Sequence, residues 1–187
     1  MEKLSIGADI GATNVRVCLG DEKGEIKDKL SEKLNVESKD SISQQIIRML
    51  KSFNVKNILS IGIGTAGPLD FKKGEISPVN IPVKNVPIVK PLKEEFDVPV
   101  YFVNDCDAGV IGEKIFGLGK DENHLAYITL SSGIGCGVMI DGKVLLGKDG
   151  NATENGHHVI DFEGKLKCAC GVYGHWEAYC SGKNIPN

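Results

Sequence analysis

Two segments in different parts of the chain share one order of elements. Residues 4–24 contain an apolar stretch, a turn of small residues (Gly11-Ala12-Thr13), a second apolar stretch and an acidic turn with glycine. Residues 125–142 repeat this order, with Ser131-Ser132-Gly133 as the small-residue turn and Asp141-Gly142 as the second turn. Short apolar stretches bounded by turn residues predict strands. The repeat therefore favours two related α/β halves, although two unrelated hairpins would produce the same pattern.

The rest of the chain mixes further strands with helices. One helix is expected over residues 41–53, because its apolar side chains fall on one face, and Ser41 with Gln44 has the spacing of a capping box. A second helix is expected over residues 105–116. Residues 65–91 are rich in Pro, Gly and Asn and are expected to be mostly loop. Strands are expected over residues 4–10, 15–19, 25–30, 58–63, 98–103, 125–130, 136–140 and 143–146.

Composition excludes several classes of protein. The 187 residues are 41% hydrophobic and 25% charged, an ordinary globular balance. A formal net charge of −3 without a long run of one sign argues against a nucleic-acid partner. The first residues lack the basic start and apolar stretch of a signal peptide, and no apolar run reaches the roughly 20 residues that span a bilayer. We therefore expect a cytoplasmic protein with no membrane partner.

Both small-residue turns could bind phosphate. Glycine permits close backbone approach, so that N–H groups can meet phosphate oxygens, and a nearby aspartate could hold Mg²⁺ directly or through water. Neither turn is followed by the Gly-Lys-Ser/Thr of a Walker A loop or by the helix of a dinucleotide site. A plain hairpin with a capping aspartate is the alternative. The candidate cofactor-binding residues are Asp9, Gly11, Ala12, Thr13, Asn14, Ser131, Ser132 and Gly133.

Asn104 and Asp105 stand between an apolar strand and a helix. A carboxylate at this position is held on a rigid frame at the end of the sheet, where it could accept a proton from a hydroxyl that attacks phosphorus. The alternative is that Asp105 only caps the helix and interacts with its dipole. From these residues alone, the capping role is the better interpretation.

The carboxyl-terminal part of the chain carries a cluster of metal-binding residue types. His157, Cys168, Cys170 and His175 offer nitrogen and sulfur ligands at a spacing that suits a tetrahedral Zn²⁺ site. Such a zinc is structural if the protein supplies all the ligands. His158 could replace His157, because neighbouring residues of an extended chain point in opposite directions. Free thiols beside surface histidines are the alternative.

These motifs occur together in one family. Across residues 4–182 the chain resembles the sugar kinases of the ROK family (repressors, open reading frames, kinases), such as glucokinase and hexokinase. That resemblance implies the α/β, actin-like (ribonuclease H-like) ATPase fold, with a small N-terminal domain over residues 1–105 and the first part of a second related domain over residues 106–187. The matching motifs are Gly7 to Asn14, Gly64 to Asp70 with Asn80, Asn104-Asp105, Leu130 to Gly137, Glu154 to His157 and Cys168 to Glu177.

The resemblance also implies a function. It indicates ATP-dependent phosphorylation of a hexose hydroxyl in carbohydrate metabolism (glycolysis), with Asp105 as general base, Mg²⁺-ATP across the two turns and a structural Zn²⁺. Like its relatives, the protein is expected to form a dimer or tetramer. The sugar would be bound by Asn80, Asn104, Asp105, Glu154, His157 and Glu177, and the zinc by His157, Cys168, Cys170 and His175.

Several features depart from the family pattern. His175 replaces a zinc-binding cysteine, Asp107 stands where asparagine is frequent, Ala12 replaces a glycine and Ser132 a threonine. Family members also continue beyond the equivalent of Asn187 with the glycines that hold adenosine, so the nucleotide site is expected to be incomplete in these 187 residues. Two alternatives therefore stay open: a non-catalytic sugar-binding regulator of the same family, or an inactive fragment of a kinase.

Overall fold

A computed structural model describes residues 3–55, 57–78 and 81–185. The chain divides into two compact units, Met1–Ala108 and Gly109–Asn187. The division falls inside helix α3 (Asp105–Ile115). No helix in the described ranges has the length and apolar character needed to cross a lipid bilayer.

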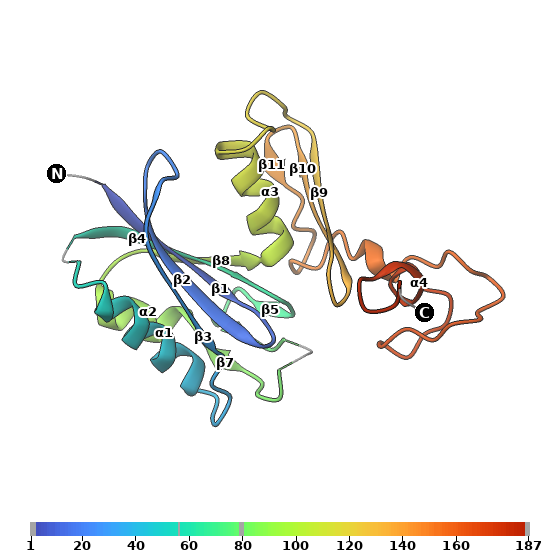
Figure 1. Ribbon diagram of the computed structural model, residues 1–187, viewed down its shortest axis with the longest axis horizontal. Coiled ribbons are helices and arrows are strands. Elements are labelled where there is room, and N and C mark those ends of the chain that lie inside the picture. Colours follow the sequence, from blue (N-terminus) through green and yellow to red (C-terminus); the bar gives the residue numbers. More distant parts are fainter. Residues whose placement is uncertain (1–2, 56, 79–80, 186–187) are drawn as a thin grey trace. The chain divides into compact units, whose positions relative to one another are not determined.

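A five-stranded sheet forms the first unit, in the order β3-β2-β1-β4-β8 (Figure 1). The first three strands pair antiparallel as the expected meander, whereas β4 and β8 continue from β1 in parallel. All five strands were expected from the sequence, with ends that differ by a few residues. Their bounds are β1 (Leu4–Ile10), β2 (Asn14–Asp21), β3 (Ile26–Lys33), β4 (Ile58–Thr65) and β8 (Val100–Asn104).

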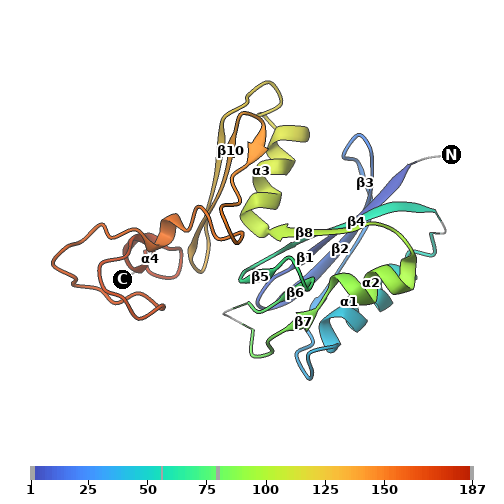
Figure 2. The ribbon, with the colours of Figure 1, turned by 180° about the vertical axis from the view of Figure 1, so that it is seen from behind.

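Two helices, α1 (Ser41–Ser52) and α2 (Val89–Phe96), cover the same face of this sheet (Figures 1 and 2). The apolar face of α1 was predicted correctly, since Ile42, Ile46 and Met49 are 0% exposed. Alternate residues of the strands meet these side chains, because side chains alternate across a pleated strand. The resulting core lies between the sheet and the two helices.

The predicted capping box at the start of α1 is wrong. Asp40 is the N-cap and makes no side-chain cap bond, and Ser41 is already helical. The Ser41 hydroxyl instead accepts the backbone N–H of Ser38 at 2.7 Å. The backbone N–H of Gln44 donates to the Asp40 carbonyl at 3.0 Å, so it needs no side-chain cap.

The segment over residues 65–91 is more regular than the predicted loop. Three short strands, β5 (Leu69–Asp70), β6 (Glu75–Ile76) and β7 (Val86–Pro87), pair antiparallel, and α2 follows at once. Helix α2 was missed because Pro91 lies inside it. Proline is tolerated in a first turn, where the amide has no intrahelical partner.

The second unit contains the strands β9 (Leu125–Leu130), β10 (Ile134–Ile140) and β11 (Lys143–Val144) in an antiparallel sheet of order β11-β10-β9. Asp141 and Gly142 form the predicted hairpin turn, with φ of 50° and 72°. Beyond the sheet, the chain is mostly irregular around the short helices η1 (Asn155–His157) and α4 (Trp176–Cys180).

Candidate functional site

The candidate catalytic residue lies at the carboxyl edge of the first unit's parallel strands. Asn104 ends β8 and is in register with Thr65 at the end of β4, which is itself in register with Ile10 at the end of β1. The small-residue turn follows Ile10, and Asp105 follows Asn104. Open α/β sheets bind ligands at this edge. The fold therefore brings the first turn and Asp105 to one end of the same sheet.

Asp105 combines one hydrogen bond to the backbone with an exposed side chain. Its Oδ1 and the Oδ1 of Asn104 both accept the backbone N–H of Cys106, each at 2.9 Å. Asp105 is already the first residue of α3, so the capping role that the sequence favoured for Asp105 is taken by Asn104, whose side chain accepts the amide two residues further on. The Asp105 side chain is nonetheless exposed, whereas Asp107 is only 5% exposed. Asp105 is consequently the carboxylate of this helix start that a ligand could reach.

The first small-residue turn uses part of its own hydrogen-bonding capacity. The Gly11 amide donates to the Asn14 carbonyl at 3.0 Å, so the amides that this turn could offer to phosphate are those of the exposed residues Ala12 and Thr13. Asp9 forms an ion pair with Arg16, with Nη1 2.7 Å from Oδ2. A Mg²⁺ ion at Asp9 would have to share this carboxylate with Arg16. The sequence analysis missed the pair, which the register of β1 and β2 places directly opposite each other.

The second small-residue turn joins β9 to β10. The Ser131 amide donates to the Gly133 carbonyl at 2.9 Å. The amide of Ile134, the residue after the turn, donates to Oε2 of Glu177 at 3.0 Å. Ser132 and Gly133 are therefore the residues whose amides could meet a phosphate here.

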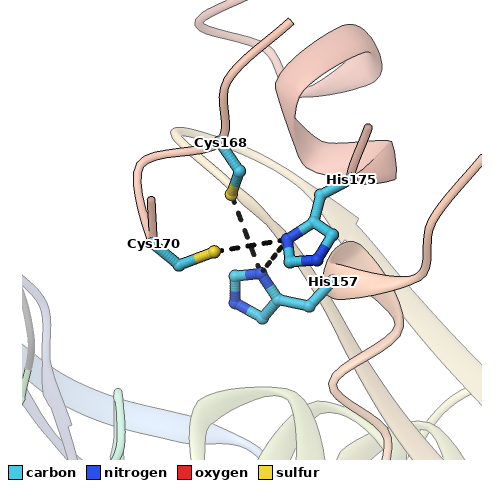
Figure 3. A group of neighbouring side chains, drawn as sticks. All are labelled: His157, Cys168, Cys170 and His175. Atoms are coloured by element: carbon cyan, nitrogen blue, oxygen red, sulfur yellow. Dashed lines mark hydrogen bonds between the residues drawn. The ribbon is translucent and has the colours of Figure 1, made fainter. Parts of the chain in front are cut away.

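The four predicted metal-binding side chains lie together in the second unit. The ligand atoms of His157, Cys168, Cys170 and His175 all lie within 4.8 Å of one another, and Figure 3 shows them converging. The two Nδ1 atoms are 3.3 Å apart, Cys168 Sγ is 3.8 Å from Nδ1 of His157, and Cys170 Sγ is 3.2 Å from Nδ1 of His175. Among the described residues His158 is not a member of this group.

These three distances are close to those expected between the ligands of a tetrahedral zinc site. Zinc lies about 2.3 Å from sulfur and about 2.0 Å from nitrogen, so tetrahedral geometry separates two nitrogens by about 3.3 Å and a nitrogen from a sulfur by about 3.5 Å. The observed nitrogen–nitrogen distance is 3.3 Å, and the nitrogen–sulfur distances of 3.2 and 3.8 Å lie on either side of the second value. The group therefore has the chemistry and the spacing to hold a metal ion.

Backbone pairing brings the two histidines together. Val159 and His175 form an antiparallel bridge, the Ile160 amide donates to Gly174, and the Trp176 amide donates to His158, both at 2.8 Å. Gly174 has a φ of 82° and is packed so closely that a Cβ there would lie under 3.0 Å from the Asp161 carbonyl. Glycine at this position therefore allows the strand-like segments on either side to approach.

Charges and burial around the group differ between its members. Cys168 is 3% exposed, and burial raises the pKa of its thiol, with the Cys170 thiol and the Glu177 carboxylate adding to the rise. Cys170 is exposed. A metal must displace the thiol protons, so its binding is expected to strengthen with rising pH.

A group of hydrogen bonds that the sequence analysis missed clamps the segment between the metal-binding residues His157 and Cys168. The Tyr179 hydroxyl donates to Asp161 and accepts the Leu166 amide at 3.0 Å. Asp161 also accepts the amides of Glu163 and Lys165. The Asp-x-x-Gly pattern at Asp161 is a turn signal that could have indicated part of this clamp.

The predicted sugar-binding residues fall on both units. Asn104 and Asp105 lie at the sheet edge of the first unit, and Asn80 lies outside the described residues. Glu154 is exposed in the second unit, just before η1. His157 belongs to the metal-binding group, and Glu177 accepts the Ile134 amide. Their roles toward a sugar stay predictions.

Comparison with known proteins gives kinases and regulators of one family. A glucokinase from Pyrobaculum calidifontis is 41% identical over 184 residues, which span 97% of this chain and 58% of that protein. A transcriptional regulator of the ROK family, a homologue of the E. coli MLC protein, superimposes with a TM-score of 0.89 at 26% identity over 100% of this chain and 48% of the regulator. The ROK family glucokinase of Streptomyces griseus, solved with glucose and AMPPNP, gives a TM-score of 0.79 at 30% identity over 97% of this chain and 58% of that one.

The match extends over nearly the whole sequence. The sequence pattern of the ROK family fits residues 5–187. The kinases of this family have the actin-like ATPase fold, and this chain carries the amino-terminal part of it. The chain belongs to the ROK family.

Proposed function

We propose that this chain serves the ATP-dependent phosphorylation of a hexose hydroxyl, with Asp105 as general base. The observation that carries the proposal is the exposed Asp105 carboxylate at the carboxyl edge of three parallel strands, where the first small-residue turn also lies. Because the chain spans 58% of the similar glucokinase, the activity is proposed for the protein at its full encoded length.

Each of the predicted site residues has a proposed role in phosphoryl transfer. Asp105 accepts the proton of the sugar hydroxyl as its oxygen attacks the terminal phosphorus. The amides of Ala12 and Thr13 in one turn, and of Ser132 and Gly133 in the other, donate to phosphate oxygens. A bound Mg²⁺ would neutralise phosphate charge, with Asp9 as the nearby hard ligand. Asn80, Asn104, Glu154, His157 and Glu177 are proposed to hydrogen-bond the sugar hydroxyls.

The metal-binding group is proposed to hold a structural Zn²⁺. Four protein ligands on one zinc ion would leave no open position for a substrate. His157 Nδ1 points into the group, which leaves Nε2 of the same ring to reach a ligand. Zinc would then fix the orientation of a sugar-binding ring, in the way that neighbouring groups orient metal ligands.

The proposal is tested by a coupled ADP-release assay on the full-length protein with a panel of hexoses. Asp105→Asn keeps an oxygen that can accept the Cys106 amide but removes the base, so we expect kcat to fall by about 10²- to 10⁴-fold. Asp97→Asn is the matched control. Asp97 is exposed with a φ of 51°, a conformation that asparagine adopts readily, and this variant should keep full activity. Near-parental turnover by Asp105→Asn would disprove the assignment of the base.

A second candidate is a sugar-binding regulator without catalysis. It is favoured by the TM-score of 0.89 to a transcriptional regulator of the same family over the whole of this chain. The same assay separates the two candidates when it is combined with calorimetry. Hexose binding without ADP release in the full-length protein would support the regulator.

A further inference from the structure

The turn between β9 and β10 is supported from outside by the metal-binding part of the same unit. The Ile134 amide, at the start of β10, donates to Oε2 of Glu177 at 3.0 Å. Oε1 of the same carboxylate is 3.7 Å from Sγ of Cys168. One half-buried carboxylate therefore touches both the turn and a residue of the metal-binding group.

Close packing shows how tightly the turn is held. A Cβ on Gly133 would lie under 3.0 Å from the Glu177 carboxylate, and a Cβ on Gly156 would lie under 3.0 Å from the Ile134 carbonyl. A Cβ on Gly182 would lie 2.9 Å from the Ser131 carbonyl. The turn and the start of β10 thus meet three separate segments, and at Gly156 and Gly182 the close atom is a backbone oxygen, so a side chain there would force the backbone to move.

Two of the three supporting segments carry metal-binding side chains. Gly156 directly precedes His157 in η1, and Glu177 lies two residues after His175, in the first turn of α4. Helix α4 has only five residues, too few to be stable without packing. The positions of Gly156 and Glu177 therefore depend on whatever holds His157, Cys168 and His175 together.

Hydrogen bonding within the turn itself contributes little to fixing its conformation. Within it, the Ser131 amide donates to the Gly133 carbonyl, and Ser131 and Ser132 are exposed. Glycine and exposed serine lose conformational freedom when they are fixed, so a turn of this composition needs external contacts to stay in one conformation. A phosphate-binding turn must hold its amides in place before the ligand arrives.

We infer that Glu177 is a positioning residue that ties the Ser131–Gly133 turn to the metal-binding group, so that metal binding orders a turn at the far end of β9. The phosphate role of this turn rests on the proposed function, but the coupling itself does not. Metal would then act on the nucleotide side of the site as well as on the sugar side.

Hydrogen exchange of single amides, measured by NMR with Zn²⁺ bound and after chelation, tests the coupling. We expect the Ile134 amide to exchange about tenfold faster or more without metal, the factor for losing a hydrogen bond to a charged acceptor. The Gly11 amide, bonded within the first unit, is the internal reference and should not respond. Equal Ile134 exchange with and without Zn²⁺ would overturn the inference.

Two variants separate coupling from general destabilisation. Glu177→Ala should make Ile134 exchange fast in both states while Co²⁺ absorption titrations show metal affinity within a few-fold of the parent. Glu177→Gln keeps an acceptor oxygen and should restore part of the protection. The control is Glu163→Ala, because Glu163 is exposed and its carboxylate pairs with Lys165.

Each further outcome is decisive. A persistent metal response of Ile134 in Glu177→Ala would assign the coupling elsewhere and refute the role of Glu177. If Glu177→Ala does not fold, Gly133→Ala displaces the carboxylate while leaving it in the chain, and the same loss of metal response is expected. An absence of kinase activity in the full-length protein with an intact metal response would contradict the proposed function alone.

Discussion

Replacing Gly156 by alanine should weaken metal binding, because Gly156 sets the position of His157. A Cβ at this residue would lie under 3.0 Å from the Ile134 carbonyl oxygen and 3.2 Å from the Ile134 Cβ. The obstacle is backbone and a β-branched side chain within a sheet, so η1 has to move, and His157 with it. Overpacking of this kind costs about 1–3 kcal/mol, and at about 1.4 kcal/mol for each factor of ten the metal affinity should fall about 5- to 150-fold.

A competition titration against a chromophoric zinc chelator measures this change directly. Gly112→Ala is the matched control, because a Cβ at Gly112 meets nothing within 4 Å and the residue lies inside α3. Alanine is favoured over glycine in a helix, so this control should bind metal as the parent does and be about 0.5–1 kcal/mol more stable. If Gly156→Ala binds zinc within twofold of the parent, η1 does not position His157 and the reasoning fails.

Two other predictions concern stability. Ile46 is 0% exposed in the first unit, so Ile46→Ala should lower the free energy of unfolding, measured by urea titration, by about 2–5 kcal/mol. Ile26 is 58% exposed, and Ile26→Ala should change this free energy by less than about 0.5 kcal/mol. Similar values for both variants would contradict the assigned core. The hydrogen bond from Tyr179, with the amides of Lys165 and Glu163, holds the pKa of Asp161 below its usual value of 3.8. A lowered carboxyl pKa contributes stability that is full above the usual value and is lost as pH falls through the folded pKa. The parent should therefore hold this loop in better order than Asp161→Asn at pH above 3.8, and the difference should shrink as pH falls from 3.8 through the lower pKa of the folded protein. NMR of Tyr179 measures it, and a pH-independent difference would show that the charge of Asp161 does not matter.

Much of the architecture followed from the sequence, because it depends on neighbouring residues. Strands such as β1 and β9 were predicted to the residue, since short apolar stretches bounded by turn residues are a local signal. The buried face of α1 followed from its helical spacing. Where a local rule had an exception, as with Pro91 inside α2, the prediction was wrong.

The residue types at the candidate site were also recognisable from sequence. Cys168 and Cys170 are close enough in the chain to indicate a metal site together with nearby histidines. Choosing between His157 and His158 required the structure, because the choice depends on the pairing of Val159 with His175. The sequence indicated both histidines as candidate ligands, and the folded backbone places His157 in the metal-binding group.

Contacts between residues distant in sequence were decided by the tertiary structure alone. The Asp9–Arg16 pair depends on the register of β1 and β2. The hydrogen bond from Ile134 to Glu177 joins a residue that precedes the metal-binding side chains in sequence to one that follows them. A sequence specifies local conformation through spacing and turn chemistry, which act over a few residues. It does not display which distant groups meet, because that is settled by the packing of whole elements against one another.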